Sequence, residues 1–234
     1  MAAQKEQDKP PLNHATKTAR HKKRDIIGSD TLFSLGAEIE AESQLRLNDK
    51  FRDAAEKGDY REVKRFLGIG VEIDSTTVQG WTALALAAGY GHTKICDLLI
   101  KNGADMDVKD RTAGLTALHW AVYRGFTEAC DLLIKEGADA AIRDWHDKTA
   151  LMLAAEYGHA EICLLLIENG VDATAYDNMR KTAREYALYN TKNEYKQTSK
   201  LLFYMEVLSS AMNKEPIGAF LVQFRECTGA TLWH

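Results

Sequence analysis

Cysteine is the first residue type to consider for chemistry in this chain, because two thiols held close together bind zinc or form a disulfide. The four cysteines are Cys96, Cys130, Cys163 and Cys227, and none of them forms the Cys-x-x-Cys pair of a zinc site. The first three follow one another at intervals of 34 and 33 residues. This interval indicates a repeated structural unit instead of a metal site.

Two other segments resemble ligand-binding loops but lack essential residues. Gly68-Ile-Gly70 has two glycines of a dinucleotide loop without the third, and no strand is expected before it. Asp105, Asp107 and Asp110 have the spacing of calcium ligands, but Asp110 occupies the position where such a loop requires glycine. We therefore predict that the chain is not an enzyme and that it holds no cofactor or metal.

The regular interval comes from three copies of one sequence pattern. Each copy starts with Thr-Ala-Leu, passes through Ala and Gly, reaches an apolar block that ends in Leu-Leu-Ile, and closes with Gly-x-Asp. The copies start at Thr82, Thr116 and Thr149, which are 34 and 33 residues apart. His92 and His159 occupy equivalent positions of this period, so we interpret them as parts of the fold and not as catalytic groups.

Each copy predicts two short helices joined by a tight turn. The threonine hydroxyl can cap the first helix by accepting a hydrogen bond from an otherwise unpaired amide. A glycine such as Gly125 ends this helix, and the Leu-Leu-Ile block forms the buried side of the second helix. Gly137 ends the second helix, and the polar stretch that follows forms a hairpin-like finger. One such unit cannot bury its apolar face alone, so the copies must stack.

These copies resemble the repeats of the ankyrin family, which have this length and a related Thr-Pro-Leu-His pattern. Weaker copies flank them, so the resemblance implies an all-α ankyrin-repeat solenoid of about five repeats over residues 47–207. The expected repeats are 47–79, 80–113, 114–146, 147–179 and 180–207. Proline is replaced by alanine in every copy, and the histidine of the pattern survives only at His119. The loop-to-helix hydrogen bonding of that histidine is therefore expected at His119 alone.

The segments outside the repeats differ in character. Residues 1–29 are predicted to be a disordered basic tail, residues 30–46 a capping helix, and residues 208–234 a C-terminal extension. The extension contains an apolar stretch, residues 217–224, that either packs against the repeats or docks on a partner. This stretch is too short to cross a membrane, and no apolar signal-peptide core is visible, so we expect a cytoplasmic or nuclear location.

Charge is unevenly distributed along the chain. Residues 1–24 carry seven Lys or Arg and two acidic residues, a net charge of +5, whereas the whole chain of 234 residues carries −4. The remainder therefore carries −9, so a basic tail precedes an acidic body. The run His21-Lys-Lys-Arg24 is either a nuclear import signal, a contact for acidic surfaces, or a solvated segment without a function.

The residues that the repeat does not dictate are the best candidates for a binding surface. The resemblance implies that a partner contacts the fingers and the exposed ends of the first helices. Tyrosine, tryptophan and arginine are the residue types enriched in interface hot spots, although tyrosines can also pack between repeats. The residues assigned to this surface are Gln79, Trp81, Tyr90, Leu115, Tyr123, Arg124, Trp145, His146, Lys148, Tyr157, Met179, Arg180, Lys181 and Tyr189, with Val78 beside them.

We therefore predict a non-enzymatic protein-interaction module that binds a partner along a concave groove. Four of the assigned residues are cationic, which favours a partner with acidic groups: Arg124, Lys148, Arg180 and Lys181. Apart from that partner, the chain is expected to be monomeric. The alternatives are a structural subunit of a larger assembly and a nuclear adaptor with a basic tail. Nucleic acid is not an expected partner, because one short basic run without interleaved aromatic residues is weak support for it.

Overall fold

The computed structural model of the chain describes residues 29–189 and residue 202. Several predicted segments lie outside these residues: nearly all of the basic tail, the C-terminal extension with Cys227, and the second helix of the last repeat apart from Leu202. Leu202, which was expected in that second helix, is helical and fully buried. The chain divides into two compact units, residues 1–46 and residues 47–234, and the second unit contains the repeats.

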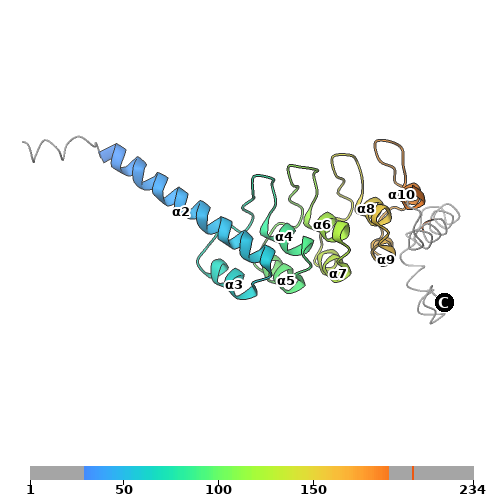
Figure 1. The fold of residues 1–234 in the computed structure, drawn as a ribbon, viewed down its shortest axis with the longest axis horizontal. Helices are drawn as coiled ribbons and strands as arrows, with labels where there is room; N and C mark the ends of the chain where they lie inside the picture. Colours follow the sequence, from blue (N-terminus) through green and yellow to red (C-terminus); the bar gives the residue numbers. More distant parts are fainter. Residues whose placement is uncertain (1–28, 190–201, 203–234) are drawn as a thin grey trace, which may run out of the picture. The chain divides into compact units, whose positions relative to one another are not determined.

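Every regular element of the described residues is a helix (Figure 1). The helices are α2 (Ser29–Lys57), α3 (Tyr60–Gly68), α4 (Ala83–Gly89), α5 (Thr93–Lys101), α6 (Ala117–Arg124), α7 (Thr127–Lys135), α8 (Ala150–Tyr157), α9 (Ala160–Glu168) and α10 (Ala183–Tyr189). Two isolated antiparallel bridges, Arg143 with Thr149 and Tyr176 with Thr182, close the bases of two fingers. The described part of the chain is thus the predicted all-α solenoid.

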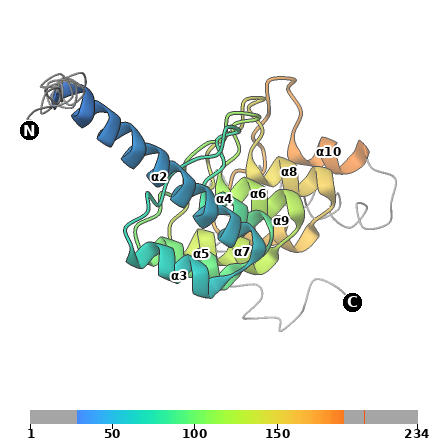
Figure 2. The same ribbon diagram turned by 60° about the vertical axis from the view of Figure 1, so that its left-hand side comes forward.

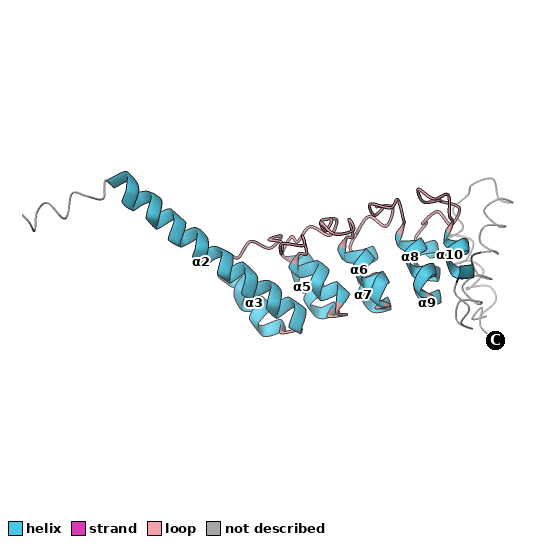
Figure 3. Cartoon of the chain, turned by 45° about the horizontal axis from the view of Figure 1, so that its top comes forward, coloured by secondary structure: helices cyan, strands magenta, loops and turns pink. Residues whose placement is uncertain are grey.

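The helix pairs stack in two layers (Figures 1 and 2). The first helices of the repeats, α4, α6, α8 and α10, contact one another in order, and so do the second helices, α3, α5, α7 and α9. The loops between successive pairs project together on one side of the stack as the predicted fingers (Figure 3). The first helices and the fingers therefore share one face, which we call the first-helix face.

Helix α2 differs from the sequence prediction. The predicted capping helix of residues 30–46 and the first helix of the first repeat are one continuous helix, Ser29–Lys57. No glycine or proline occurs between residues 37 and 57, so nothing in the sequence interrupts the helical backbone there. The part from Leu47 onward belongs to the repeat unit, where Phe51 packs edge-on against Phe66 of α3 with ring centroids 6.4 Å apart.

The threonines cap the first helices as predicted. The hydroxyl of Thr82 accepts a hydrogen bond from the amide of Ala85 at 3.1 Å, and Thr149 accepts one from Met152 at 3.3 Å. Glu185 occupies the family's histidine position in the last repeat, and its carboxylate accepts a hydrogen bond from the Thr182 amide at 2.7 Å. A side-chain hydrogen bond to the amide of the capping threonine was expected only at His119. The carboxylate of Glu185 forms the equivalent hydrogen bond in the last repeat.

At the third repeat, Thr116 and His119 form a reciprocal capping box. The Thr116 hydroxyl accepts from the His119 amide, and Nδ1 of His119 accepts from the Thr116 amide at 3.3 Å. The imidazole is completely buried, and this burial lowers the pKa of His119 to about 4. Because the unfolded chain binds a proton that the folded chain excludes, this group favours folding most at neutral pH.

We predict that His119 makes the fold acid-sensitive between pH 6.5 and 4. In that window its extra contribution to the free energy of unfolding falls by on the order of 3 kcal/mol as pH decreases. His119→Gln keeps an acceptor for the Thr116 amide but does not titrate, so the variant should lose less stability over the same window. Urea unfolding of both proteins at several pH values measures the difference, and parallel pH profiles would contradict the prediction.

The three cysteines at equivalent positions are confirmed as core residues. Cys96, Cys130 and Cys163 are fully buried in the second helices. Burial raises the pKa of the Cys96 and Cys130 thiols to about 12 and raises that of Cys163 further. Such thiols are protonated and unreactive at neutral pH, so they act as small apolar side chains.

The glycines that end the first helices position neighbouring repeats. Gly125 has a φ of +80°, which few other residues adopt readily. A Cβ atom at this position would lie 2.6 Å from Cε1 of His159 in the next repeat. The same contact joins Gly58 to His92, whose Nε2 lies 2.9 Å from the Glu56 carbonyl oxygen. Glycine is thus required both for the turn and for the close approach of the next ring.

We predict that Gly125→Ala destabilises the stack by about 2 kcal/mol, from backbone strain together with displacement of the His159 ring. Gly103 provides a matched control, because it has a φ of +87° and no atom within 4 Å of its Cβ position. Gly103→Ala should therefore cost only the backbone strain, about 1 kcal/mol. Thermal unfolding measures both variants, and equal losses would show that the ring contact contributes nothing.

Candidate protein-binding surface

Three of the predicted tyrosines line the first-helix face. Tyr90, Tyr123 and Tyr157 lie at or just after the ends of α4, α6 and α8, and they are 45%, 37% and 40% exposed. The rings of Tyr123 and Tyr157 meet edge-to-face with centroids 4.6 Å apart. The Tyr90 hydroxyl donates a hydrogen bond to the Glu56 carboxylate at 2.9 Å. Each tyrosine is therefore held by a neighbour while part of its ring faces solvent; the side chain of Tyr189 lies outside the described residues.

Arg124 lies within this row of tyrosines. Its guanidinium carbon is 5.7 Å from the ring centroid of Tyr90 and 5.8 Å from that of Tyr123. Both distances are within the range of cation–π attraction, which holds the side chain in place without neutralising its charge. Among the described residues no carboxylate forms an ion pair with it. Arg124 is therefore a positioned cation on the exposed face.

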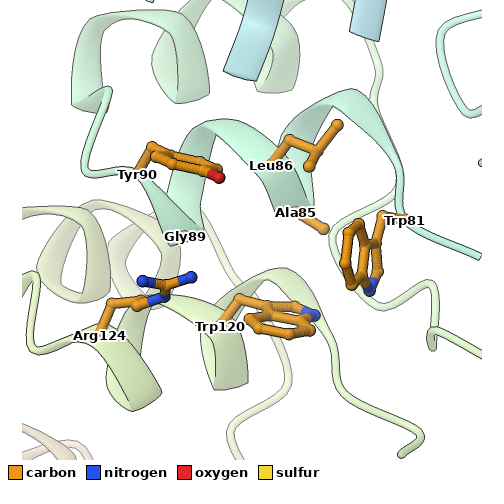
Figure 4. Close-up of a pocket in the computed structure, with 7 residues that line it drawn as sticks. All are labelled: Trp81, Ala85, Leu86, Gly89, Tyr90, Trp120 and Arg124. Carbon is orange, nitrogen blue, oxygen red and sulfur yellow. The ribbon is translucent and has the colours of Figure 1, made fainter. Parts of the chain in front are cut away.

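A pocket opens between α4 and α6 beside this arginine (Figure 4). The indole rings of Trp81 and Trp120 meet edge-to-face with centroids 5.4 Å apart, and Trp120 also contacts Tyr123 at 5.8 Å. The cavity has a volume of about 50 Å³. Its walls are Trp81, Ala85, Leu86, Gly89, Tyr90, Trp120 and Arg124.

Buried aspartates hold the fingers in shape. One carboxylate oxygen of Asp110 accepts hydrogen bonds from the amides of three successive residues, 112–114, at 2.8 to 3.1 Å. Its other oxygen accepts from the Trp120 indole at 3.0 Å, so the same side chain fixes a finger and a wall of the pocket. These hydrogen bonds outweigh the desolvation of the carboxylate and lower its pKa. Asp144 and Asp177 hold the next two fingers in the same way.

Most of the predicted finger residues are exposed. Trp145 is 56% exposed and Met179 is 60% exposed, and Gln79, Val78 and His146 also face solvent. One side of the Trp145 ring covers Gly114, where a Cβ atom would approach it to 2.5 Å. Arg180 is exposed and its guanidinium lies 5.9 Å from the Tyr176 ring. The finger tips therefore present large side chains, and the ring of Trp145 rests on the finger of the preceding repeat.

Three predicted site residues are placed differently by the structure. Leu115 is buried and packs in the core, so the prediction that it contacts a partner from an exposed position is wrong. Lys148 pairs with Glu156 at 2.8 Å, and its ammonium lies 4.4 Å from the Tyr186 ring centroid, with only 15% of its side chain exposed. Lys181 is half-buried and also lies over Tyr186, at 5.7 Å. Both lysines are satisfied within the stack, which leaves fewer cations available to a partner than the sequence indicated.

Sequence reasoning missed the residues that support this surface. Trp120 was not assigned to it, although it is an aromatic residue at a position that holds leucine in the repeats on either side, Leu86 and Leu153. Asp110 was considered only as a calcium ligand. The signal that could have identified the finger anchors is their period, since Asp110, Asp144 and Asp177 are spaced by 34 and 33 residues.

We predict that Asp110→Ala destabilises the protein by about 2–3 kcal/mol, because it leaves three finger amides and the Trp120 indole without an acceptor. Asp131→Ala is the control, since it removes only an exposed ion pair with Lys135 and should cost about 0.5 kcal/mol or less. Urea unfolding gives both free energies, and hydrogen exchange should accelerate at residues 112–114 in Asp110→Ala alone. Unchanged exchange there would contradict the anchoring role.

The described residues contain no group of three or more metal-ligating side chains, and none of their helices is long and apolar enough to cross a membrane. The exposed first-helix face of this part of the chain consists of aromatic side chains, one positioned arginine and loops anchored by aspartates.

Comparison with known proteins identifies the repeats. A family model for ankyrin repeats in three copies matches residues 51–144, and a second ankyrin-repeat model matches residues 133–187. Ankyrin repeats generally serve as protein–protein interaction modules.

Individual relatives share only part of their length with the chain. Human ankyrin repeat domain-containing protein 40 is 36% identical over 66 residues, which is 28% of this chain and 18% of that protein. The putative ankyrin repeat protein YahD of Escherichia coli (strain K12) is 41% identical over 59 residues, or 25% of this chain and 29% of YahD. The chain thus spans less than a third of each of these relatives. The two family models together run from residue 51 to residue 187, and the chain belongs to the ankyrin-repeat family.

Proposed function

We propose that this chain is a non-enzymatic protein-interaction module that binds a partner through the first-helix face and the fingers. The observation that carries the proposal is the row of exposed tyrosines with Arg124 held among them. Their rings and the guanidinium are large, rigid groups that can bury area on a partner with little loss of side-chain entropy. Stacking of the repeats does not need these exposed parts, so their recurrence supports a role in contact.

The opposite layer has a different surface. Along the second helices, Lys101 pairs with Asp97 and Lys135 pairs with Asp131, each within one helix and each at 2.8 Å or less. In these exposed i,i+4 ion pairs the charges of the two lysines are paired within the chain. The contrast favours the first-helix face as the side on which the partner binds.

We further propose that the chain acts as an adaptor in the cytoplasm or the nucleus, with the basic run His21–Arg24 as a candidate import signal. A structural subunit of a larger assembly remains the alternative role for the same face. Limited proteolysis separates the two, because a built-in subunit should protect residues 1–29 in cell extracts but not in the free protein.

We predict that Tyr123→Ala, Trp145→Ala and Tyr157→Ala each reduce recovery of the partner at least tenfold, because truncation at an interface hot spot costs about 2 kcal/mol or more. Quantitative mass spectrometry of proteins that copurify with the tagged full chain measures the recovery.

Tyr60→Ala is the matched control. Tyr60 begins α3 in the opposite layer and is 43% exposed, similar to the tyrosines of the first-helix face. This variant should recover the same partner as the wild type. Equal recovery by Tyr60→Ala and the three first-helix-face variants would refute the proposed surface.

A further inference from the structure

The pocket between α4 and α6 has two chemically different ends (Figure 4). Trp81 and Trp120 form an apolar end, and Tyr90 and Arg124 lie together at the other end. Leu86 and Ala85 of α4 also line it, and both are almost fully buried, so the floor is well packed. A ligand that fills this pocket therefore needs an apolar group at one end and a group that can bind the Arg124 guanidinium at the other end.

The volume limits the apolar part. A water molecule needs about 10–15 Å³ of the same kind of volume, so the pocket's 50 Å³ corresponds to about four heavy atoms. The side chain of leucine has four carbon atoms beyond the backbone, whereas an indole ring has nine heavy atoms. The enclosed part of the pocket therefore suits a branched aliphatic side chain better than an indole ring.

Charge complementarity defines the other part. Arg124 is exposed and has no ion-pair partner within the described ranges, residues 29–189 and residue 202. Within the same ranges the Glu56 carboxylate accepts the Tyr90 hydroxyl but forms no ion pair with Arg124. A guanidinium binds a carboxylate with two parallel hydrogen bonds, which makes an acid the natural ligand for this side chain.

The other cations near the first-helix face are less suited to this role. Lys148 is mostly buried and paired with Glu156. Arg180 shares a cavity with Arg143 and with three aspartates, Asp147, Asp172 and Asp177, so carboxylates of the chain itself already outnumber the guanidiniums there. Of these three cations, Arg124 is therefore the one best placed to bind the acid of a partner.

We infer that the pocket between α4 and α6 anchors a partner segment through a leucine-sized aliphatic side chain with a carboxylate beside it, the side chain lying against Trp81 and Trp120 and the carboxylate on Arg124. This inference rests on the proposed function, because it names the chemistry by which the first-helix face recognises its partner. It also replaces the general expectation of an acidic partner with one defined pairing of groups.

Small probes test the pocket directly in the full chain. N-acetyl-L-leucine carries the isobutyl group beside a carboxylate, N-acetyl-L-leucinamide lacks the charge, and N-acetylglycine lacks the side chain. Binding is followed by the indole N–H resonances of Trp81 and Trp120, with Trp145 as an internal reference. N-acetyl-L-leucine should shift the first two saturably and bind at least fivefold more tightly than either other probe.

Arg124→Gln should reduce the preference for N-acetyl-L-leucine over the amide to less than twofold while leaving binding of the amide unchanged. Arg180→Gln is the matched control, because it also removes a guanidinium that lies near a tyrosine ring, and it should keep the preference. The inference is overturned by equal affinities for the acid and the amide, by a preference that persists in Arg124→Gln, or by the absence of saturable shifts at Trp81 and Trp120.

The outcome separates this inference from the proposed function. If the probes fail while partner recovery still depends on Tyr123, Trp145 and Tyr157, the surface stands and the anchoring chemistry is wrong. If recovery does not depend on those three residues, the proposed function itself fails whatever the probes show.

Discussion

Burial of each helix pair by the next pair is the interaction on which the rest of this structure depends. Alanines such as Ala88 and Ala121 are completely buried between first helices, and their small size lets α4 and α6 approach closely. The rings of His92 and His159 lie over glycines of the preceding repeat, where any side chain would collide. A single helix pair exposes apolar surface on both sides and must be covered by its neighbours. The alanine contacts and the histidine–glycine contacts therefore fix both the distance between neighbouring repeats and their alignment.

The pocket is a consequence of this packing at one particular junction. Two positions, one on either side of the capping threonine, differ between repeats. The residue directly before the threonine is, in order, Trp81, Leu115, Lys148 and Lys181. The residue four positions after the threonine is, in order, Leu86, Trp120, Leu153 and Tyr186. At the junction of α8 and α10, the long side chain of Lys148 lies over the Tyr186 ring. At the junction of α4 and α6, two indole rings meet edge-to-face and leave an opening beside Arg124. A common backbone thus carries different chemistry at each junction.

The contrast between a common repeat backbone and junctions that differ in their side chains explains how far the sequence could predict the structure. The helix pairs, the threonine caps and the buried cysteines follow from local pattern and period, and the structure confirms them. The environments of Leu115 and Lys148 did not follow, because they depend on residues in other repeats, such as Tyr186 for Lys148. Trp120 was missed for the same reason, since its role arises from contact with Trp81 of the preceding repeat. The repeated features are set within one repeat, whereas the environments of Lys148 and Trp120 are set partly by contacts between residues more than 30 positions apart.

The fingers show why such a surface can differ between repeats without loss of stability. Asp144 and Asp177 lie beneath their loops and bind backbone amides, so they fix the loop whatever side chains the tip carries. The tip position four residues before the capping threonine holds Val78, Thr112, Trp145 and Asn178 in turn. Backbone amides do not depend on the side chain, so the tips at Trp145 and Asn178 are held in the same way. Rigidity comes from the buried aspartate and recognition from the exposed tip, and the two can change independently of one another.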